Sequence, residues 1–130
     1  MTTDQDSKLI AIVDDDQSVQ NALQDLIESE GLSARCFGSA EQFLQARAQH
    51  QSGCLIVDIR MPGISGLELQ AKLNASRCRI PIIFITAHGD EDMRMQALRA
   101  GAVAFLTKPI DGEALLQRVR AALSIEGLKL

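Results

Sequence analysis

The chain has 130 residues, of which 46% are hydrophobic and 23% are charged, and these values are typical of one soluble globular domain. Its formal net charge is −4, and it contains four Phe but no Trp or Tyr. Direct binding of nucleic acid by these residues is not expected, because they supply neither a basic surface nor a set of stacking rings.

Neither an export signal nor a membrane span is expected, because the N-terminal residues are polar and acidic and the apolar runs are too short to cross a bilayer. The three cysteines, Cys36, Cys54 and Cys78, are widely spaced and form no CxxC pair. This pattern favours free thiols in a reducing cytoplasm.

Short β-branched runs alternate along the chain with segments of helical period. Strands are expected at Leu9–Val13, Ser33–Phe37, Cys54–Val57, Ile82–Ile85 and Val103–Leu106. The expected helices are a segment around Val19–Ile27 that Gly31 ends, a segment from Ser39 to about Gln49, a segment containing Leu69 and Leu73, a segment from Asp90 to Gly101, and a segment from Asp111 to Leu123.

Polar residues at the helix starts indicate where the helices begin. Ser39 followed by Gln42 has the spacing of a capping box. Asp90 and Asp111 can cap the last two helices, and Asp16 is better explained as an N-cap than as a metal ligand.

Five alternations of strand and helix indicate an α/β domain with one parallel sheet and helices on both faces, because parallel strands need crossover connections. We expect a single flavodoxin-like (βα)5 domain with strand order 2-1-3-4-5. In this interpretation residues 8–124 form the domain, residues 1–7 are a polar N-terminal extension, and residues 125–130 are a C-terminal tail or the start of a linker.

Chemically active side chains follow four of the five strands. Asp14 and Asp15 come after the first strand, Asp58 ends the third, Thr86 ends the fourth, and Lys108 follows the fifth. Ligands of such sheets bind at the carboxyl ends of the strands, beside the point where the strand order reverses. We therefore expect these five residues to meet on one rim of the sheet.

Carboxylates that lie this close together repel one another unless a cation joins them. Their hard oxygen ligands favour Mg²⁺. Lys108 adds a compact positive charge for an anionic ligand, and Thr86 offers a hydroxyl donor. An aspartate in such surroundings can act as a nucleophile and accept a phosphoryl group.

These motifs resemble those of a known family, the response-regulator receiver domain. The matching segments are Asp14-Asp15, Asp58-Ile-Arg-Met-Pro-Gly63 with Ser65-Gly66, Thr86-Ala87, and Lys108-Pro109. The resemblance covers roughly Lys8 to Leu123, and every motif is in order. The runs Thr86-Ala-His-Gly-Asp90 and Gly101-Ala-Val-Ala-Phe105 look like those of receivers that precede a helix-turn-helix DNA-binding domain in transcription regulators.

The resemblance implies a role for each rim residue. Asp58 would be the phosphoacceptor, and a partner histidine kinase would supply the phosphoryl group. Asp15 and Asp58 would bind Mg²⁺ together with the backbone carbonyl of Arg60, and Asp14 would hold a water of the metal. Thr86 and Lys108 would contact the phosphoryl oxygens, and the peptide bond between Lys108 and Pro109 would be cis.

The resemblance also implies a switch that couples Thr86 to Phe105 on the fifth strand. When Thr86 moves toward the phosphoryl group, the ring of Phe105 can turn into the vacated space. The response would reach the surface formed by the last two helices and the strand between them, which would then support a phosphorylation-dependent homodimer. Transcription would be regulated through an effector domain that these residues do not include.

Other functions stay open. A stand-alone receiver or a phosphorylation-independent binding module would use the same fold. An aspartate-nucleophile phosphatase of the haloacid-dehalogenase kind needs a second acid where this chain has Arg60, and a flavin-binding domain needs a phosphate-cradling loop after the first strand. We expect the chain to turn over no external substrate and therefore not to be an enzyme.

Arg60 and His88 each lie two residues beyond an active-site residue. We hypothesise that they flank the phosphoryl site and tune hydrolysis of phosphorylated Asp58, which the dephosphorylation rates of Arg60→Ala and His88→Ala would test. For His88, a plain loop position is the alternative.

Overall fold

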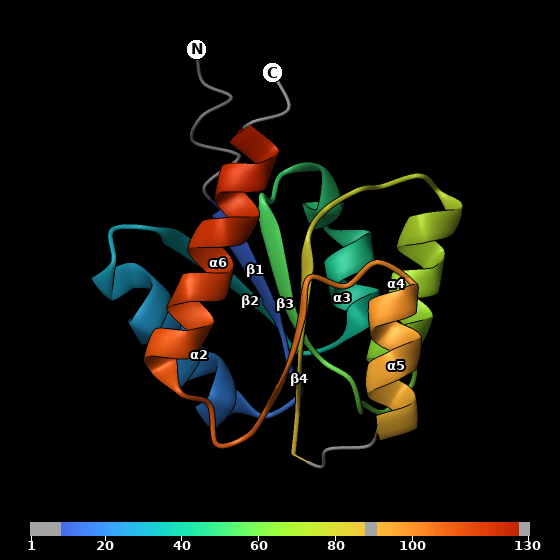
Figure 1. The fold of residues 1–130 in the computed structure, drawn as a ribbon, viewed down its shortest axis with the longest axis horizontal. Helices are drawn as coiled ribbons and strands as arrows, with labels where there is room; N and C mark the ends of the chain where they lie inside the picture. The colour runs from blue at the N-terminus through green and yellow to red at the C-terminus, as the bar shows by residue number, and fades with distance from the viewer. Residues whose placement is uncertain (1–8, 88–90, 128–130) are drawn as a thin grey trace.

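The computed structural model describes residues 9–87 and 91–127, with side chains as far as residue 124. Five strands form one parallel sheet, and helices cover both of its faces (Figure 1). The strands are β1 (Leu9–Val13), β2 (Ser33–Phe37), β3 (Cys54–Asp58), β4 (Ile82–Thr86) and β5 (Ala104–Thr107). Their order is β2-β1-β3-β4-β5, which confirms the expected flavodoxin-like topology. The prediction for the fifth strand was one residue early.

Six helical segments connect the strands and complete the fold (Figure 1). They are α2 (Gln17–Ser29), α3 (Ala40–Gln45), the 3₁₀ turn η1 (Ala48–His50), α4 (Gly66–Ala75), α5 (Glu91–Arg99) and α6 (Gly112–Gly127). The last helix extends four residues beyond its expected end at Leu123.

The expected helix from Ser39 to Gln49 was wrong in its second half. The α-helix α3 ends at Gln45, and Arg47 has a left-handed backbone with φ of 54°. This turn interrupts the helix and starts η1, in which Ala48 is fully buried. Sequence pattern alone missed the break because Ala and Gln are good helix formers and Arg rarely adopts a positive φ.

Most of the expected N-caps are confirmed. The carboxylate of Asp16 accepts the backbone N–H of Ser18, and that of Asp111 accepts the N–H of Glu113. The hydroxyl of Ser39 likewise caps α3. Asp90 lies outside the described residues. A full capping box occurs at the start of α4, between Ser65 and Glu68, where the sequence pattern was not recognised.

The core consists of two clusters, one on each face of the sheet. Leu69 and Leu73 of α4, with residues of α3 and α5, pack against one face. Leu23 of α2 and Val119 of α6 pack against the other. Because apolar strand residues alternate between these clusters, β3 and β4 are buried on both faces and hold their ends rigidly.

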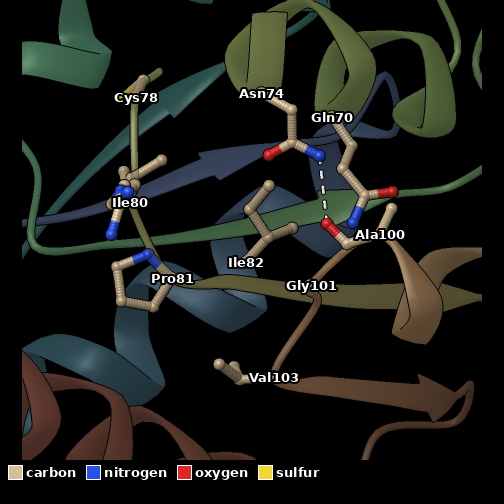
Figure 2. A pocket seen from close by; sticks show the side chains of 10 residues that line it. Gln70, Asn74, Cys78, Ile80, Pro81, Ile82, Ala100, Gly101 and Val103 are labelled. Atoms are coloured by element: carbon tan, nitrogen blue, oxygen red, sulfur yellow. Dashed lines mark hydrogen bonds between the residues drawn. The ribbon is translucent and has the colours of Figure 1, made fainter.

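Side-chain amides of α4 tie this helix to the end of α5. The Nε2 of Gln70 donates to the carbonyl oxygen of Ala97 at 3.0 Å, and the Nδ2 of Asn74 donates to that of Ala100 at 3.0 Å. Figure 2 shows the amide of Asn74 reaching Ala100 above a cavity of about 260 Å³. The cavity lies at the amino-terminal edge of the sheet, remote from the strand ends that carry the acidic residues.

The three cysteines are free thiols, as expected. Cys54 is fully buried in β3, and its burial raises the pKa of the thiol to about 12. Within the described ranges, no helix combines the length and the apolar character needed to cross a membrane.

Gly66 starts α4 directly against the end of β3. A Cβ atom at this position would lie 2.7 Å from the carbonyl oxygen of Asp58 and 2.8 Å from the Cα of Ile59. Both contacts are to backbone, so rotation of a neighbouring side chain cannot relieve them. The absence of a side chain at Gly66 therefore lets the helix approach the strand end that carries Asp58.

We predict that Gly66→Ala lowers the free energy of unfolding by about 1–3 kcal/mol, the usual cost of overpacking. Equilibrium urea unfolding followed by circular dichroism measures this change. Gly38→Ala is the matched control, because a Cβ there would meet only side-chain atoms at 3.5 Å or more. Equal stability losses in the two variants would contradict the steric argument.

Candidate functional site

The acidic residues predicted from the sequence meet at the carboxyl edge of the sheet. Asp14 and Asp15 follow β1, and Asp58 is the last residue of the neighbouring strand β3. One carboxylate oxygen from each residue lies within 4.8 Å of the other two. The parallel pairing of β1 with β3 produces this arrangement, because it places their carboxyl ends side by side.

Lys108 brings a positive charge to the same edge. Its ammonium nitrogen lies 2.9 Å from Oδ2 of Asp58 and 3.2 Å from Oδ2 of Asp14. Burial alone would lower the pKa of Lys108, but its hydrogen bond to Asp58 and the negative charges of Asp14 and Asp58 raise that pKa above its usual value. Lys108 therefore stays charged while it bridges two acids. The peptide bond between Lys108 and Pro109 is cis, as expected.

Asp14 is fully buried, and its carboxylate is held on both oxygens. Oδ1 accepts the backbone N–H of Asp16 at 2.8 Å, while Oδ2 faces Lys108. Burial raises the pKa of Asp14; the N–H of Asp16 opposes this effect, and the charge of Asp58 adds to it. The site thus contains an acid whose ionised form is disfavoured until further positive charge arrives.

Asp58 and Asp15 differ in their surroundings. The side chain of Asp58 is 9% exposed, and its Oδ1 accepts the backbone N–H of Arg60 at 2.9 Å. Asp15 is exposed, and no described residue forms a hydrogen bond or an ion pair with its carboxylate. Asp58 is therefore held in place by its neighbours, whereas Asp15 is oriented by its backbone.

The side chain of Arg60 points toward α5. Its Nη2 lies 3.7 Å from the sulfur of Met93. This contact links the loop after β3 with α5, the helix whose C-terminal end is hydrogen-bonded to α4. His88 lies outside the described residues, so the hypothesis that Arg60 and His88 tune hydrolysis stays a prediction.

Thr86 and Phe105 lie on the same face of the sheet. Phe84 pairs directly with Phe105, and Thr86 pairs with Thr107. Because side chains two residues apart on a strand share a face, Thr86 shares the face of Phe84 and Phe105. Thr86 is fully buried, and the rings of Phe84 and Phe105 are 6.5 Å apart. The two predicted switch residues are thus diagonal neighbours.

Sequence reasoning missed Gln20, a polar residue that contacts the backbone of Asp14. Gln20 lies on α2 in line with the buried residues Leu23 and Ile27. A signal was present in the sequence, because the spacing of 3 and 7 residues places Gln20 on the apolar face of that helix. A buried side-chain amide needs hydrogen-bond partners, and the backbone at the end of the adjoining strand β1 can supply them.

Known proteins match this chain over most of its length. A family model described as the response regulator receiver domain matches residues 10–120. Response regulator protein TmoT of Ectopseudomonas mendocina is 50% identical over 122 residues, which make up 94% of this chain and 55% of that protein. Transcriptional regulatory protein FixJ of Azorhizobium caulinodans is 43% identical over 88% of this chain and 54% of its own length. The chain thus spans about half the length of these relatives.

Solved structures agree with the sequence matches. The response regulator StyR is 45% identical, with a TM-score of 0.86 over 93% of this chain and 61% of that one. The structure described as FixJ-N is 34% identical, with a TM-score of 0.81 over 89% of this chain and 93% of that one. With the parallel sheet and the acidic edge in place, the chain belongs to the family of response regulator receiver domains.

Proposed function

We propose that this receiver domain accepts a phosphoryl group on Asp58 from the phosphohistidine of a partner kinase. The observation that carries the proposal is the position of Asp58, which forms an ion pair with Lys108 at 2.9 Å and lies beside the carboxylates of Asp14 and Asp15. In the transfer, a carboxylate oxygen of Asp58 attacks phosphorus, the P–N bond breaks, and its electron pair stays on the imidazole. The domain modifies itself and turns over no external substrate.

The residues around Asp58 have separate parts in this reaction. Lys108 would move from the free carboxylate to the phosphoryl oxygens, where its charge offsets the charge that they carry. Thr86 would donate its hydroxyl to another phosphoryl oxygen. The N–H of Arg60 already binds Oδ1 of Asp58, which keeps the carboxylate from rotating.

The acidic group fits Mg²⁺. Three carboxylates can place oxygen atoms within 4.8 Å of one another, and oxygen is the ligand that Mg²⁺ prefers. Asp15, Asp58 and the carbonyl of Arg60 would hold the ion directly, and Asp14 would hold one of its waters. When bound, the ion would supply positive charge to the acids and to the phosphoryl oxygens. The burial of Asp14 supports this fit, because a carboxylate that is removed from water is stabilised by a nearby cation.

The acceptor role predicts a specific gain in mass. Incubation of the chain with acetyl phosphate and Mg²⁺ should add one phosphate per molecule, measured by intact mass spectrometry. Asp58→Asn should abolish the gain, whereas Asp25→Asn, which alters an exposed acid on α2, should leave it intact. Unchanged labelling of Asp58→Asn would refute the assignment, and steady hydrolysis of small phosphate monoesters would favour a phosphatase instead.

The raised pKa of Asp14 predicts how the free energy of unfolding depends on pH when Mg²⁺ is removed. A carboxyl whose pKa is raised on folding contributes stability that is present below its unfolded pKa, about 3.9, and is lost as pH rises through the folded pKa. In EDTA at pH 7, Asp14→Asn should therefore unfold at a higher urea concentration than the wild type, by about 0.5 M, and the gain should shrink at pH 4.

With Mg²⁺ present, the wild type should unfold at a higher urea concentration than Asp14→Asn. Binding to the folded state stabilises the wild type, while Asp14→Asn should gain less, because it lacks the negative charge that holds a water of the ion. Urea unfolding at both pH values, with EDTA and with Mg²⁺, measures all four conditions. A lower midpoint for Asp14→Asn than for the wild type at pH 7 in EDTA would contradict the argument.

We further propose that phosphorylation changes the surface formed by α5, β5 and α6, and that two copies associate through it. Strand β5 is an edge strand of the sheet, and Met95 and Val103 are the large apolar residues that lie exposed among the described residues. Met95 lies on α5, and Val103 directly precedes β5. Movement of Thr86 and Phe105 would alter the packing under this surface. In a full-length regulator of the FixJ kind, the dimer would be the form that controls transcription.

Beryllofluoride with Mg²⁺, which mimics the phosphoryl group, should convert the monomer into a dimer in light scattering after gel filtration. Met95→Glu should raise the dimer dissociation constant by about tenfold or more, because it places a charge in the apolar contact. Asn21→Glu changes an exposed residue on α2 and should have no such effect. A monomer at all concentrations, or equal effects of the two variants, would argue against this surface.

A further inference from the structure

Gln20 is a polar side chain on the buried face of α2. It is 8% exposed and lies in line with Leu23 and Ile27, which pack into the core. An apolar residue would satisfy packing at such a position, and burying an amide is costly unless its groups are hydrogen-bonded. The contacts of this amide therefore indicate why the position is polar.

The amide of Gln20 joins α2 to the ends of two strands. Its Nε2 donates to the carbonyl oxygen of Asp14 at 2.6 Å and, more weakly, to that of Phe37 at 3.5 Å. The oxygen of Phe37 also accepts the N–H of Asp14 at 3.1 Å. The short bond to Asp14 is thus the principal contact, and it holds the chain just beyond β1.

The bonded carbonyl belongs to the peptide unit between Asp14 and Asp15. Because a peptide unit is planar, holding its oxygen also sets the position of the nitrogen of Asp15 and the direction in which Asp15 leaves the strand. The carboxylate of Asp14 has its own partners in Asp16 and Lys108. The carboxylate of Asp15 has none among the described residues, so its aim depends on this peptide unit.

We infer that Gln20 is a positioning residue for the divalent cation. By holding the peptide between Asp14 and Asp15, it orients the carboxylate of Asp15 toward Asp58 before the ion binds. This inference rests on the proposed function, since it concerns the same cation. Groups that orient metal ligands typically change metal affinity by tenfold or more when they are removed, because the ligands must then be ordered at the moment of binding.

A purely structural hydrogen bond predicts a different result. If Gln20 only supplied a hydrogen-bond donor to the buried carbonyl oxygen of Asp14, its loss would lower the stability of the fold. The Mg²⁺ affinity of the folded molecules would then stay unchanged. Gln20→Met separates the two cases, because Met has nearly the same length but cannot donate a hydrogen bond. Gln24→Met is the matched control, one turn further along α2, where the amide donates to Glu28 and does not contact Asp14.

Isothermal titration of metal-stripped protein with Mg²⁺ gives the direct readout, since the chain has no Trp to report binding by fluorescence. We expect the dissociation constant of Gln20→Met to rise about tenfold and that of Gln24→Met to stay within about twofold of the wild type. Urea unfolding of each variant records any loss of stability separately.

Phosphorylation by acetyl phosphate gives a second readout. The Mg²⁺ concentration for half-maximal labelling should rise about tenfold in Gln20→Met, while the rate at saturating Mg²⁺ stays within about twofold. A changed plateau with an unchanged half-saturating concentration would overturn the inference, and so would wild-type Mg²⁺ affinity in Gln20→Met.

Three further results can be told apart. If Gln20→Met does not fold, as judged by circular dichroism, Gln20→Ala is measured in its place. The same tenfold rise in the Mg²⁺ dissociation constant is then expected. If the wild type itself binds no Mg²⁺, the proposed function fails and the inference fails with it. If the wild type binds Mg²⁺ and the variant binds it equally well, only the role of Gln20 is overturned.

Discussion

The concentration of charge at the carboxyl edge of the sheet is the constraint on which the rest of the structure depends. Asp14, Asp15 and Asp58 bring three acids together, and Lys108 bridges two of them. Lys108 supplies one positive charge beside three carboxylates, and burial, with a smaller contribution from the charge of Asp58, raises the pKa of Asp14. Three carboxylate oxygens that lie within 4.8 Å of one another can hold a divalent cation.

Such a site must be rigid, because repelling groups separate wherever the backbone allows it. Strand β3 is buried on both faces, so the end of β3 cannot shift without disturbing two core clusters. Gly66 lets α4 pack against the carbonyl of Asp58, and Gln20 holds the carbonyl of Asp14. Helices on opposite faces of the sheet thus support neighbouring acids.

The same packing can carry a signal away from the site. Helix α4 begins against Asp58. It is hydrogen-bonded to the end of α5 through Gln70 and through Asn74, whose bond to Ala100 is drawn in Figure 2. Arg60, two residues after Asp58, reaches the other part of α5 through Met93. Together with the shared face of Thr86 and Phe105, these contacts connect the proposed acceptor with the edge of the sheet at β5.

The sequence by itself determined the strands, their order and the acidic edge, because continuous β-branched runs and helical repeats are local patterns and parallel strands permit few topologies. Five rim residues were predicted to meet because they end or follow neighbouring strands, and four of them, Asp14, Asp15, Asp58 and Lys108, lie together in the structure. Tertiary structure alone decided the break at Arg47, after which Ala48 is fully buried in η1. It also decided the partner of Gln20, because a hydrogen bond between a helix side chain and a strand end depends on how the two elements pack, and no local pattern encodes that distance.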